Sequence, residues 1–136
     1  MTCASCWVTT ASINSSTPSL VWADTFIHGI PRKTTVVKDG DIVKVDVGAY
    51  YKGFHGDCAD TFVCGDTDEE TNKFIKTAQE SFYKALECAI PGNRIGDISE
   101  AIQKCVEGKG YFVVKKFIGH GIGQKLHDAP DVPNYG

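Results

Sequence analysis

Apolar and polar residues alternate most regularly just after Asp41. Valines at positions 43, 45 and 47 alternate with Lys44, Asp46 and Gly48, so apolar side chains would share one face of a half-buried strand and polar ones the other. A second run, residues 53–65, returns after Tyr51 and Lys52. The pattern predicts an antiparallel β-hairpin, and with Tyr51 and Lys52 as its two-residue turn Asp46 would lie directly opposite Asp57.

A helical pattern follows, over about residues 68–90. Thr67 and Glu70 have the spacing of a capping box at its start, and Pro91-Gly92 stops it. Apolar side chains recur along it at intervals of three and four residues, namely Phe74, Ile75, Ala78, Phe82, Ala85, Leu86 and Ala89.

A second helix is expected over about residues 98–107, opened by Asp97 with Glu100 and closed near Gly108. Residues 111–123 have the pattern of strand and loop, and residues 127–136 are turn-rich. Helices combined with a hairpin in place of a βαβ crossover predict the α+β class.

Composition narrows the class of protein without naming a function. The chain has 136 residues, 42% of them hydrophobic and 23% charged, with a net charge of −3. These values are typical of one globular domain and give no sign of a nucleic-acid or membrane surface. Residues 1–23 show little periodicity, and no signal peptide or transmembrane span is predicted. Cys3 and Cys6 have CxxC spacing, but no second such pair and no histidine pair at zinc-finger spacing follow. All six cysteines are interpreted as reduced thiols of a cytosolic protein.

The two aspartates of the hairpin raise a question of electrostatics. Like charges directly opposite each other destabilise a sheet, so Asp46 and Asp57 need compensation. One or two divalent cations would supply it, because carboxylate oxygens suit hard and borderline metals. If the turn lies elsewhere, the same two groups can instead be merely solvated. The spacing alone leaves both interpretations open.

Histidines favour the metal interpretation. Three of the four, His28, His55 and His120, lie in glycine-containing segments, and Gly119, Gly121 and Gly123 would let the backbone around His120 approach closely. Imidazole with carboxylates is a common ligand set for Zn, Mn, Fe or Co. A histidine in such a loop is often structural, but its occurrence beside paired aspartates makes His120 a candidate ligand.

Four segments of the chain together have a recognisable pattern. They are HGIP (28–31), KDGDIVKVDVGAYYKGFHGD (38–57), RIGDISEAI (94–102) and GHGIGQKLHDAP (119–130). In sequence, order and spacing they resemble the type I methionine aminopeptidases of peptidase family M24. The resemblance implies a pita-bread fold, in which two pseudo-symmetric halves enclose a two-metal site.

The resemblance also implies roles for individual residues. Asp46, Asp57 and His120 would be metal ligands, with Asp57 bridging two divalent ions (Co, Mn, Fe or Zn). His127 would contact the substrate carbonyl and His28 would lie near the scissile peptide bond, so both are the expected catalytic and substrate-binding histidines. Leu126 would border the methionine pocket, where the family has an aromatic wall. His55 is expected to be structural.

The implied function is metal-dependent removal of N-terminal methionine from peptides and nascent proteins in the cytoplasm. Expected partners are peptide and nascent-chain N-termini, with ribosome association as one option, and neither nucleic acid nor membrane. A full-length protein would be a monomer, whereas a fragment could self-associate through uncovered strand edges.

Two departures from the family pattern qualify these expectations. The family has two further glutamate ligands, one of which is also the general base. No residue of the 136 matches either glutamate. Residues 1–136 are therefore expected to be a single, C-terminally truncated metallopeptidase domain, a partial pita-bread fold of antiparallel hairpins with covering helices, and of low or no activity. Nine residues, 15–23, separate Asn14 from Asp24 where the pattern has none, which predicts an insertion.

Two alternatives remain from the sequence. The chain could be a catalytically inactive pita-bread module or fragment that binds N-termini or other partners without cleaving them. It could also be a related aminopeptidase, such as a proline-specific one, because such enzymes share the two-aspartate hairpin. HGIP at residues 28–31 and the short N-terminal region favour the methionine enzyme.

Overall fold

The computed structural model describes residues 19–21, 34 and 36–136. Its elements are β1 (Ser19–Val21), β2 (Ile42–Tyr51), β3 (Phe54–Val63), α1 (Glu69–Cys88), α2 (Ile95–Glu107), β4 (Gly119–Gly121) and β5 (Asp128–Val132). The strands form an antiparallel three-stranded sheet of order β1-β2-β3 and a two-stranded ribbon, β4-β5. The predicted α+β class is confirmed.

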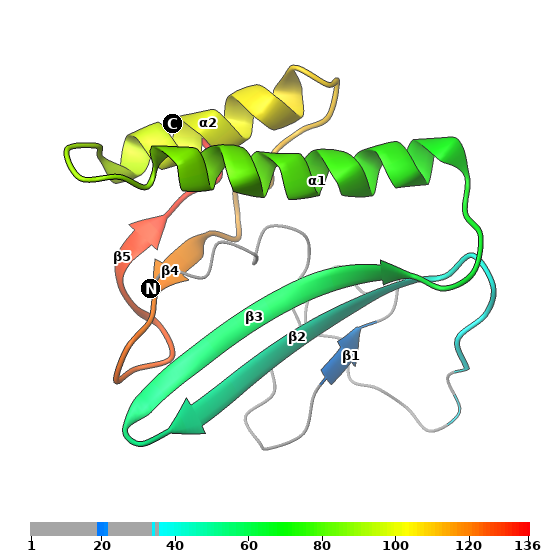
Figure 1. The fold of residues 1–136 in the computed structure, drawn as a ribbon, viewed down its shortest axis with the longest axis horizontal. Coiled ribbons are helices and arrows are strands. Elements are labelled where there is room, and N and C mark those ends of the chain that lie inside the picture. The colour runs from blue at the N-terminus through cyan, green and yellow to red at the C-terminus, as the bar shows by residue number, and fades with distance from the viewer. Residues whose placement is uncertain (1–18, 22–33, 35) are drawn as a thin grey trace.

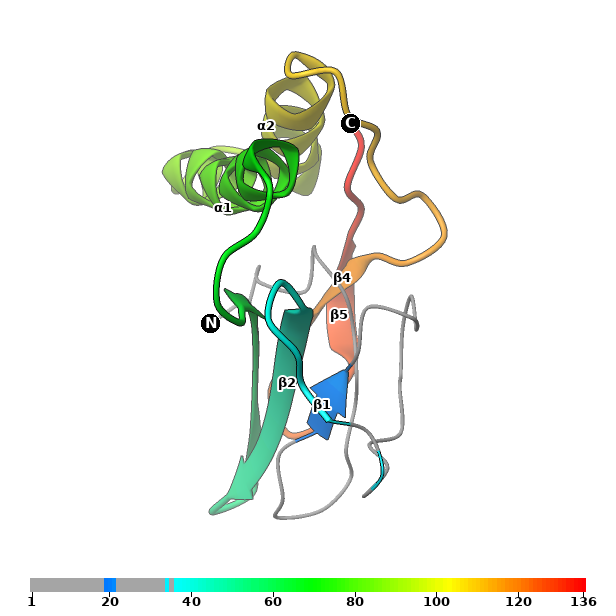
Figure 2. The same ribbon diagram turned by 90° about the vertical axis from the view of Figure 1, so that its right-hand side faces the viewer.

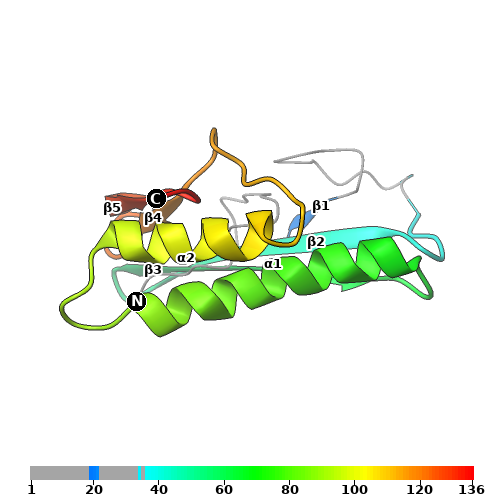
Figure 3. The same cartoon turned by 90° about the horizontal axis from the view of Figure 1, so that it is seen from above.

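The two helices form a layer of their own above the strands (Figures 1 and 2). Viewed from above, α1 and α2 lie side by side, and the β4-β5 ribbon lies next to α2 (Figure 3). None of the helices in the described part is long and apolar enough to cross a membrane. The cysteines of that part, Cys58, Cys64, Cys88 and Cys105, are free thiols, whereas Cys3 and Cys6 lie outside it.

The β2-β3 hairpin forms as predicted, but its turn is one residue further along. Tyr51 pairs with Phe54, so Lys52 and Gly53 make the turn, with φ of 48° and 88°. Two positive φ angles are what a type I′ hairpin turn requires, and glycine adopts them readily. The prediction of Tyr51-Lys52 as the turn was therefore wrong.

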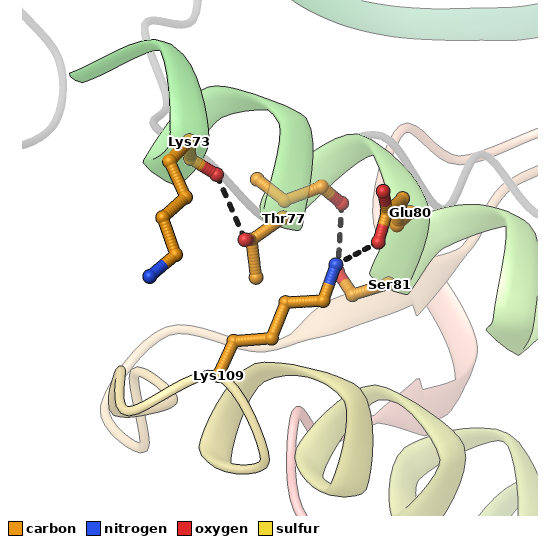
Figure 4. Close-up of polar contacts among 6 residues, drawn as sticks. Lys73, Thr77, Glu80, Ser81 and Lys109 are labelled. Carbon is orange, nitrogen blue, oxygen red and sulfur yellow. Dashed lines mark hydrogen bonds and ion pairs between the residues drawn. The ribbon is translucent and has the colours of Figure 1, made fainter. Parts of the chain in front are cut away.

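The helix pair packs through small side chains. Thr77, Ser81 and Ala85, spaced four residues apart on α1, are each at most 2% exposed, as is Ile102 on α2. The two buried hydroxyls donate to carbonyls of their own helix: Thr77 Oγ1 to Lys73 at 2.8 Å and Ser81 Oγ to Ala78 at 2.7 Å. Figure 4 shows these bonds, and Lys109 reaching from the end of α2 to the carboxylate of Glu80. These bonds lower the cost of burying the two hydroxyls of α1. Ser99 Oγ on α2 is also buried and has no hydrogen-bond partner in the described part.

Both helix starts differ from the prediction. Asp68, not Thr67, caps α1, and its carboxylate accepts from the amide (2.8 Å) and hydroxyl (2.7 Å) of Thr71. The helix α2 begins at Ile95, and Asp97 lies inside its first turn, where it accepts from the Arg94 amide at 2.6 Å. An acidic side chain accepts a backbone N–H either as the cap or from the third helical position, so sequence spacing alone does not separate the two.

The Asp68 cap makes stability depend on pH. Hydrogen bonds from the Thr71 side chain and backbone lower the pKa of Asp68 below its usual value of 3.8. A carboxyl with a lowered folded-state pKa contributes stability above the unfolded pKa, and this is lost as pH falls through the folded pKa. We expect Asp68→Ala to lower the unfolding temperature at neutral pH, and this loss to shrink below about pH 3.8. Thermal unfolding followed by circular dichroism across the carboxyl range measures it. Asp66→Ala, exposed and outside the cap, should behave like the parent chain at every pH.

The C-terminal residues also differ from the prediction of a turn-rich tail. Residues 128–132 form β5, which pairs with β4, while residues 111–118 contain no strand. The segment Ser19–Val21 pairs with β2, with Ser19 opposite Asp46. This strand comes from the predicted insertion at residues 15–23, and that insertion stays a prediction.

Candidate metal centre

Asp46 and Asp57 share one face of the hairpin but are not directly opposite. Asp46 pairs with Ala59, and Asp57 pairs with Gly48. Because Asp57 and Ala59 are two residues apart on β3, Asp46 and Asp57 lie on the same face as diagonal neighbours, with their Cα atoms about 7–8 Å apart. The prediction that Asp57 lies directly opposite Asp46 was therefore wrong. Because the turn is at Lys52-Gly53, the residue opposite Asp46 is Ala59.

The aspartate face is partly enclosed. Asp46 is 4% exposed and the Asp57 side chain 13%. Lys44 lies two residues before Asp46 on the same strand, and burial lowers the pKa of its amine. A buried carboxylate is tolerated only with a cation or hydrogen-bond donors nearby. The face therefore provides the environment that a cation site needs.

His120 approaches this face from the β4-β5 ribbon. Its Nε2 lies 3.8 Å from Asp57 Oδ2, too far for a hydrogen bond. Its Nδ1 lies 2.8 Å from the carbonyl oxygen of Gly121. A carbonyl can only accept, so Nδ1 donates this bond, and Nε2 is the ring nitrogen on the side of Asp57.

The ribbon is held against the hairpin by its backbone. The His55 amide of β3 donates to the Gly123 carbonyl at 2.8 Å, which connects the loop after β4 to the strand that carries Asp57. The His55 ring packs on Tyr50, with centroids 4.8 Å apart. His55 thus has a place in the framework, in line with the structural role expected for it.

Glycine is required at the bend that follows His120. A Cβ on Gly121 would lie 2.2 Å from the carbonyl oxygen of Ala129 in β5, so no larger residue fits there. The pairing of β4 with β5 shifts between His120 and Gly121. This close approach brings His127 next to His120, with ring centroids 4.2 Å apart.

The remaining predicted site residues are placed less fully. Leu126 is half-buried in the loop between β4 and β5, and His127 beside it is exposed. His28 lies outside the described residues. Asn134 is a buried residue that the sequence patterns missed, since its segment was interpreted only as turns. Its position between Pro133 and Tyr135 was the signal available.

The donor set fits a divalent metal in part. Two atoms bound to one ion at about 2.0–2.2 Å lie at most about 4.4 Å apart, so the Nε2–Oδ2 separation of 3.8 Å is compatible with a shared ion. Asp46 supplies another carboxylate on the same face. Within residues 36–136 and the short stretches described before them, however, no three His, Cys, Asp or Glu side chains gather closely enough to hold an ion. The described part therefore offers an incomplete ligand set.

Known proteins resemble this chain over most of its length. The model of metallopeptidase family M24 matches residues 8–136. A methionine aminopeptidase of Clostridium acetobutylicum is 53% identical over 110 residues, covering 81% of this chain and 44% of that protein. Methionine aminopeptidase 1 of Bacillus subtilis is 46% identical, with the same coverage of both chains.

Solved structures show the same fold. The methionine aminopeptidase of Thermotoga maritima has a TM-score of 0.83 at 43% identity, covering 88% of this chain and 48% of that one. A prolidase of Pyrococcus horikoshii has a TM-score of 0.77 at 26% identity, covering 87% and 35%. The chain spans less than half the length of these relatives, and its α+β elements form part of the pita-bread fold. With the family model matched from residue 8 to residue 136, the chain belongs to the M24 metallopeptidases.

Proposed function

We propose that this chain is part of a methionine aminopeptidase, which removes N-terminal methionine from peptides and nascent proteins in the cytoplasm. The observation that carries the proposal is the approach of His120 Nε2 to Asp57 Oδ2 on the face that also holds Asp46. The high identity to bacterial methionine aminopeptidases supports the choice of substrate.

In this proposal Asp46, Asp57 and His120 hold two divalent ions, drawn from Mn, Fe, Co or Zn. Bound there, such ions would polarise the scissile carbonyl and lower the pKa of a bound water toward neutral. Asp57 is central because it lies between Asp46 on its own sheet face and His120 on the ribbon.

The neighbouring residues would bind and orient the substrate. His127, beside His120, would donate a hydrogen bond to the substrate carbonyl oxygen as charge develops there. His28 would lie near the scissile peptide bond, and Leu126 would contact the methionine side chain. Removal of the water proton requires a general base. In the described part no carboxylate gathers with Asp57 and His120 to form a group of three donors.

A polypeptide of residues 1–136 alone would also self-associate under this proposal. Large apolar side chains on the sheet face opposite the aspartates are 40–71% exposed, and contiguous exposed apolar surface promotes association. They are Val47, Tyr51, Phe54 and Phe62.

Peptide specificity tests the assignment. The test protein is residues 1–136 fused to the part of Bacillus subtilis methionine aminopeptidase 1 that follows the matched region. With Mn²⁺ or Co²⁺ added, it is expected to release methionine from Met-Ala-Ser faster than it cleaves Ala-Pro-Ser. Preference for the proline peptide would instead assign a proline-specific enzyme. Metal binding without cleavage of either peptide would assign a binding module.

A further inference from the structure

Asn134 makes a pair of bonds that connects two distant parts of the chain. The residue is 5% exposed. Its Nδ2 donates to the carbonyl oxygens of Val114 at 2.5 Å and Phe117 at 2.8 Å. Both partners are acceptors, so the amide nitrogen, and not the oxygen, must face them. One buried side chain thus holds a whole turn of the 111–118 segment, which contains no strand.

These bonds close the open end of the ribbon that carries His120. Gly119 pairs with Val132 at that end. The segment ending at Phe117 leads into β4, and Asn134 lies two residues after the end of β5. The two bonds from Asn134 to Val114 and Phe117, called the Asn134 clamp below, therefore join the residues before β4 to the residues after β5. His120 is three residues beyond one of its anchor points.

The clamp is itself fixed to the helix layer. The Gly136 amide donates to Gln103 Oε1 of α2 at 3.2 Å, and Gly136 packs closely against Glu100. The Lys115 amine lies 5.7 Å from the centroid of the Tyr135 ring. Val132 on one side of Asn134 pairs with β4, and Gly136 on the other side is bonded to α2. Asn134 therefore holds the 111–118 segment at a fixed position.

We propose that Asn134 is a positioning residue that sets where His120 lies relative to Asp57 and His127. This inference rests on the proposed metal centre. Only the donors of the amide are used, since Asn134 Oδ1 is buried without a hydrogen-bond partner in the described part. A carboxyl group of the same shape has at most one proton to donate, so Asn134→Asp removes at least one of the two bonds while preserving volume.

The test compares Asn134→Ala and Asn134→Asp with the parent 136-residue chain. The first readout needs no metal: the nuclear Overhauser effect between the rings of His120 and His127, whose centroids are 4.2 Å apart. We expect it to weaken in both variants. The second readout is affinity for Mn²⁺ alone, followed by electron paramagnetic resonance. Outer-shell changes cost about 10–100-fold in metal affinity, and we expect a loss of about 10-fold.

Asn93→Ala is the matched control, because Asn93 Nδ2 also donates to a backbone carbonyl, that of Cys88 at 3.0 Å, far from His120 in the chain. It should change neither readout. If the Asn134 variants only lower the unfolding temperature, with both readouts unchanged below it, the positioning role is overturned. Asp57→Asn separates the two proposals: if it weakens Mn²⁺ binding and the Asn134 variants do not, the metal centre stands and this inference fails.

Discussion

A polypeptide of residues 1–136 alone is expected to cleave Met-Ala-Ser at least about 1,000-fold more slowly than the same residues fused to the remainder of the Bacillus subtilis relative. Loss of a general base costs about 100- to 10,000-fold, and incomplete coordination adds to that. The described part brings together Asp57 and His120 but no three donors close enough to hold an ion. Initial rates of methionine release, at saturating Mn²⁺ and equal protein concentration, measure the ratio.

The control for this comparison is the fusion with Asp57→Asn, which should fall to the rate of the short polypeptide. Near-equal rates for the short polypeptide and the parent fusion would contradict the expectation. They would mean that residues 1–136 supply a base and the missing ligands, from the same chain or from a second copy.

Asp57→Asn in the fusion is expected to weaken Mn²⁺ binding by about 100-fold or more, because changes behind the ligands already cost about 10–100-fold. The substitution keeps the side chain's size and removes its charge. Asp60→Asn is the matched control on the same strand. Asp60 pairs with Val45 and lies on the opposite face of the sheet, where it is exposed, so its substitution should leave affinity within about twofold.

Isothermal titration calorimetry on the apoprotein measures both affinities. Equal losses in the two variants would indicate a general effect of negative charge on Mn²⁺ binding. Unchanged affinity in Asp57→Asn would show that Asp57 is not a metal ligand. The short distance between His120 and Asp57 would then no longer support a metal centre.

Local patterns predicted the helices well and the hairpin in part. The 3.6-residue periodicity of α1 depends on contacts between near neighbours, and capping ambiguity moved its start by only one residue. The hairpin was misplaced because two turns one residue apart satisfy the same alternation. The conformational preference of Gly53, with its φ of 88°, decides between them. Asp46 and Asp57 still share a face, since the change of register preserves the parity of their positions.

The convergence of His120 on Asp57 could not be derived from periodicity. It depends on the bond from His55 to Gly123, which joins residues far apart in the chain, and on the irregular pairing of β4 with β5. Only the resemblance of the GHGIG segment to a known family placed His120 near the aspartates. Asn134 was not predicted as a buried residue, because asparagine is also common in exposed turns. Only its tertiary contacts with Val114 and Phe117 distinguish the two cases.

The bond between His55 and Gly123 involves main-chain atoms at both ends. Replacing His55 by almost any other residue leaves the backbone N–H in place. The hydrogen bond that joins the loop after β4 to the hairpin therefore does not depend on the side chain at position 55. Proline is the exception, because it has no N–H to donate. A substitution at position 55 would therefore remove the ring contact with Tyr50 but keep the backbone bond between loop and strand.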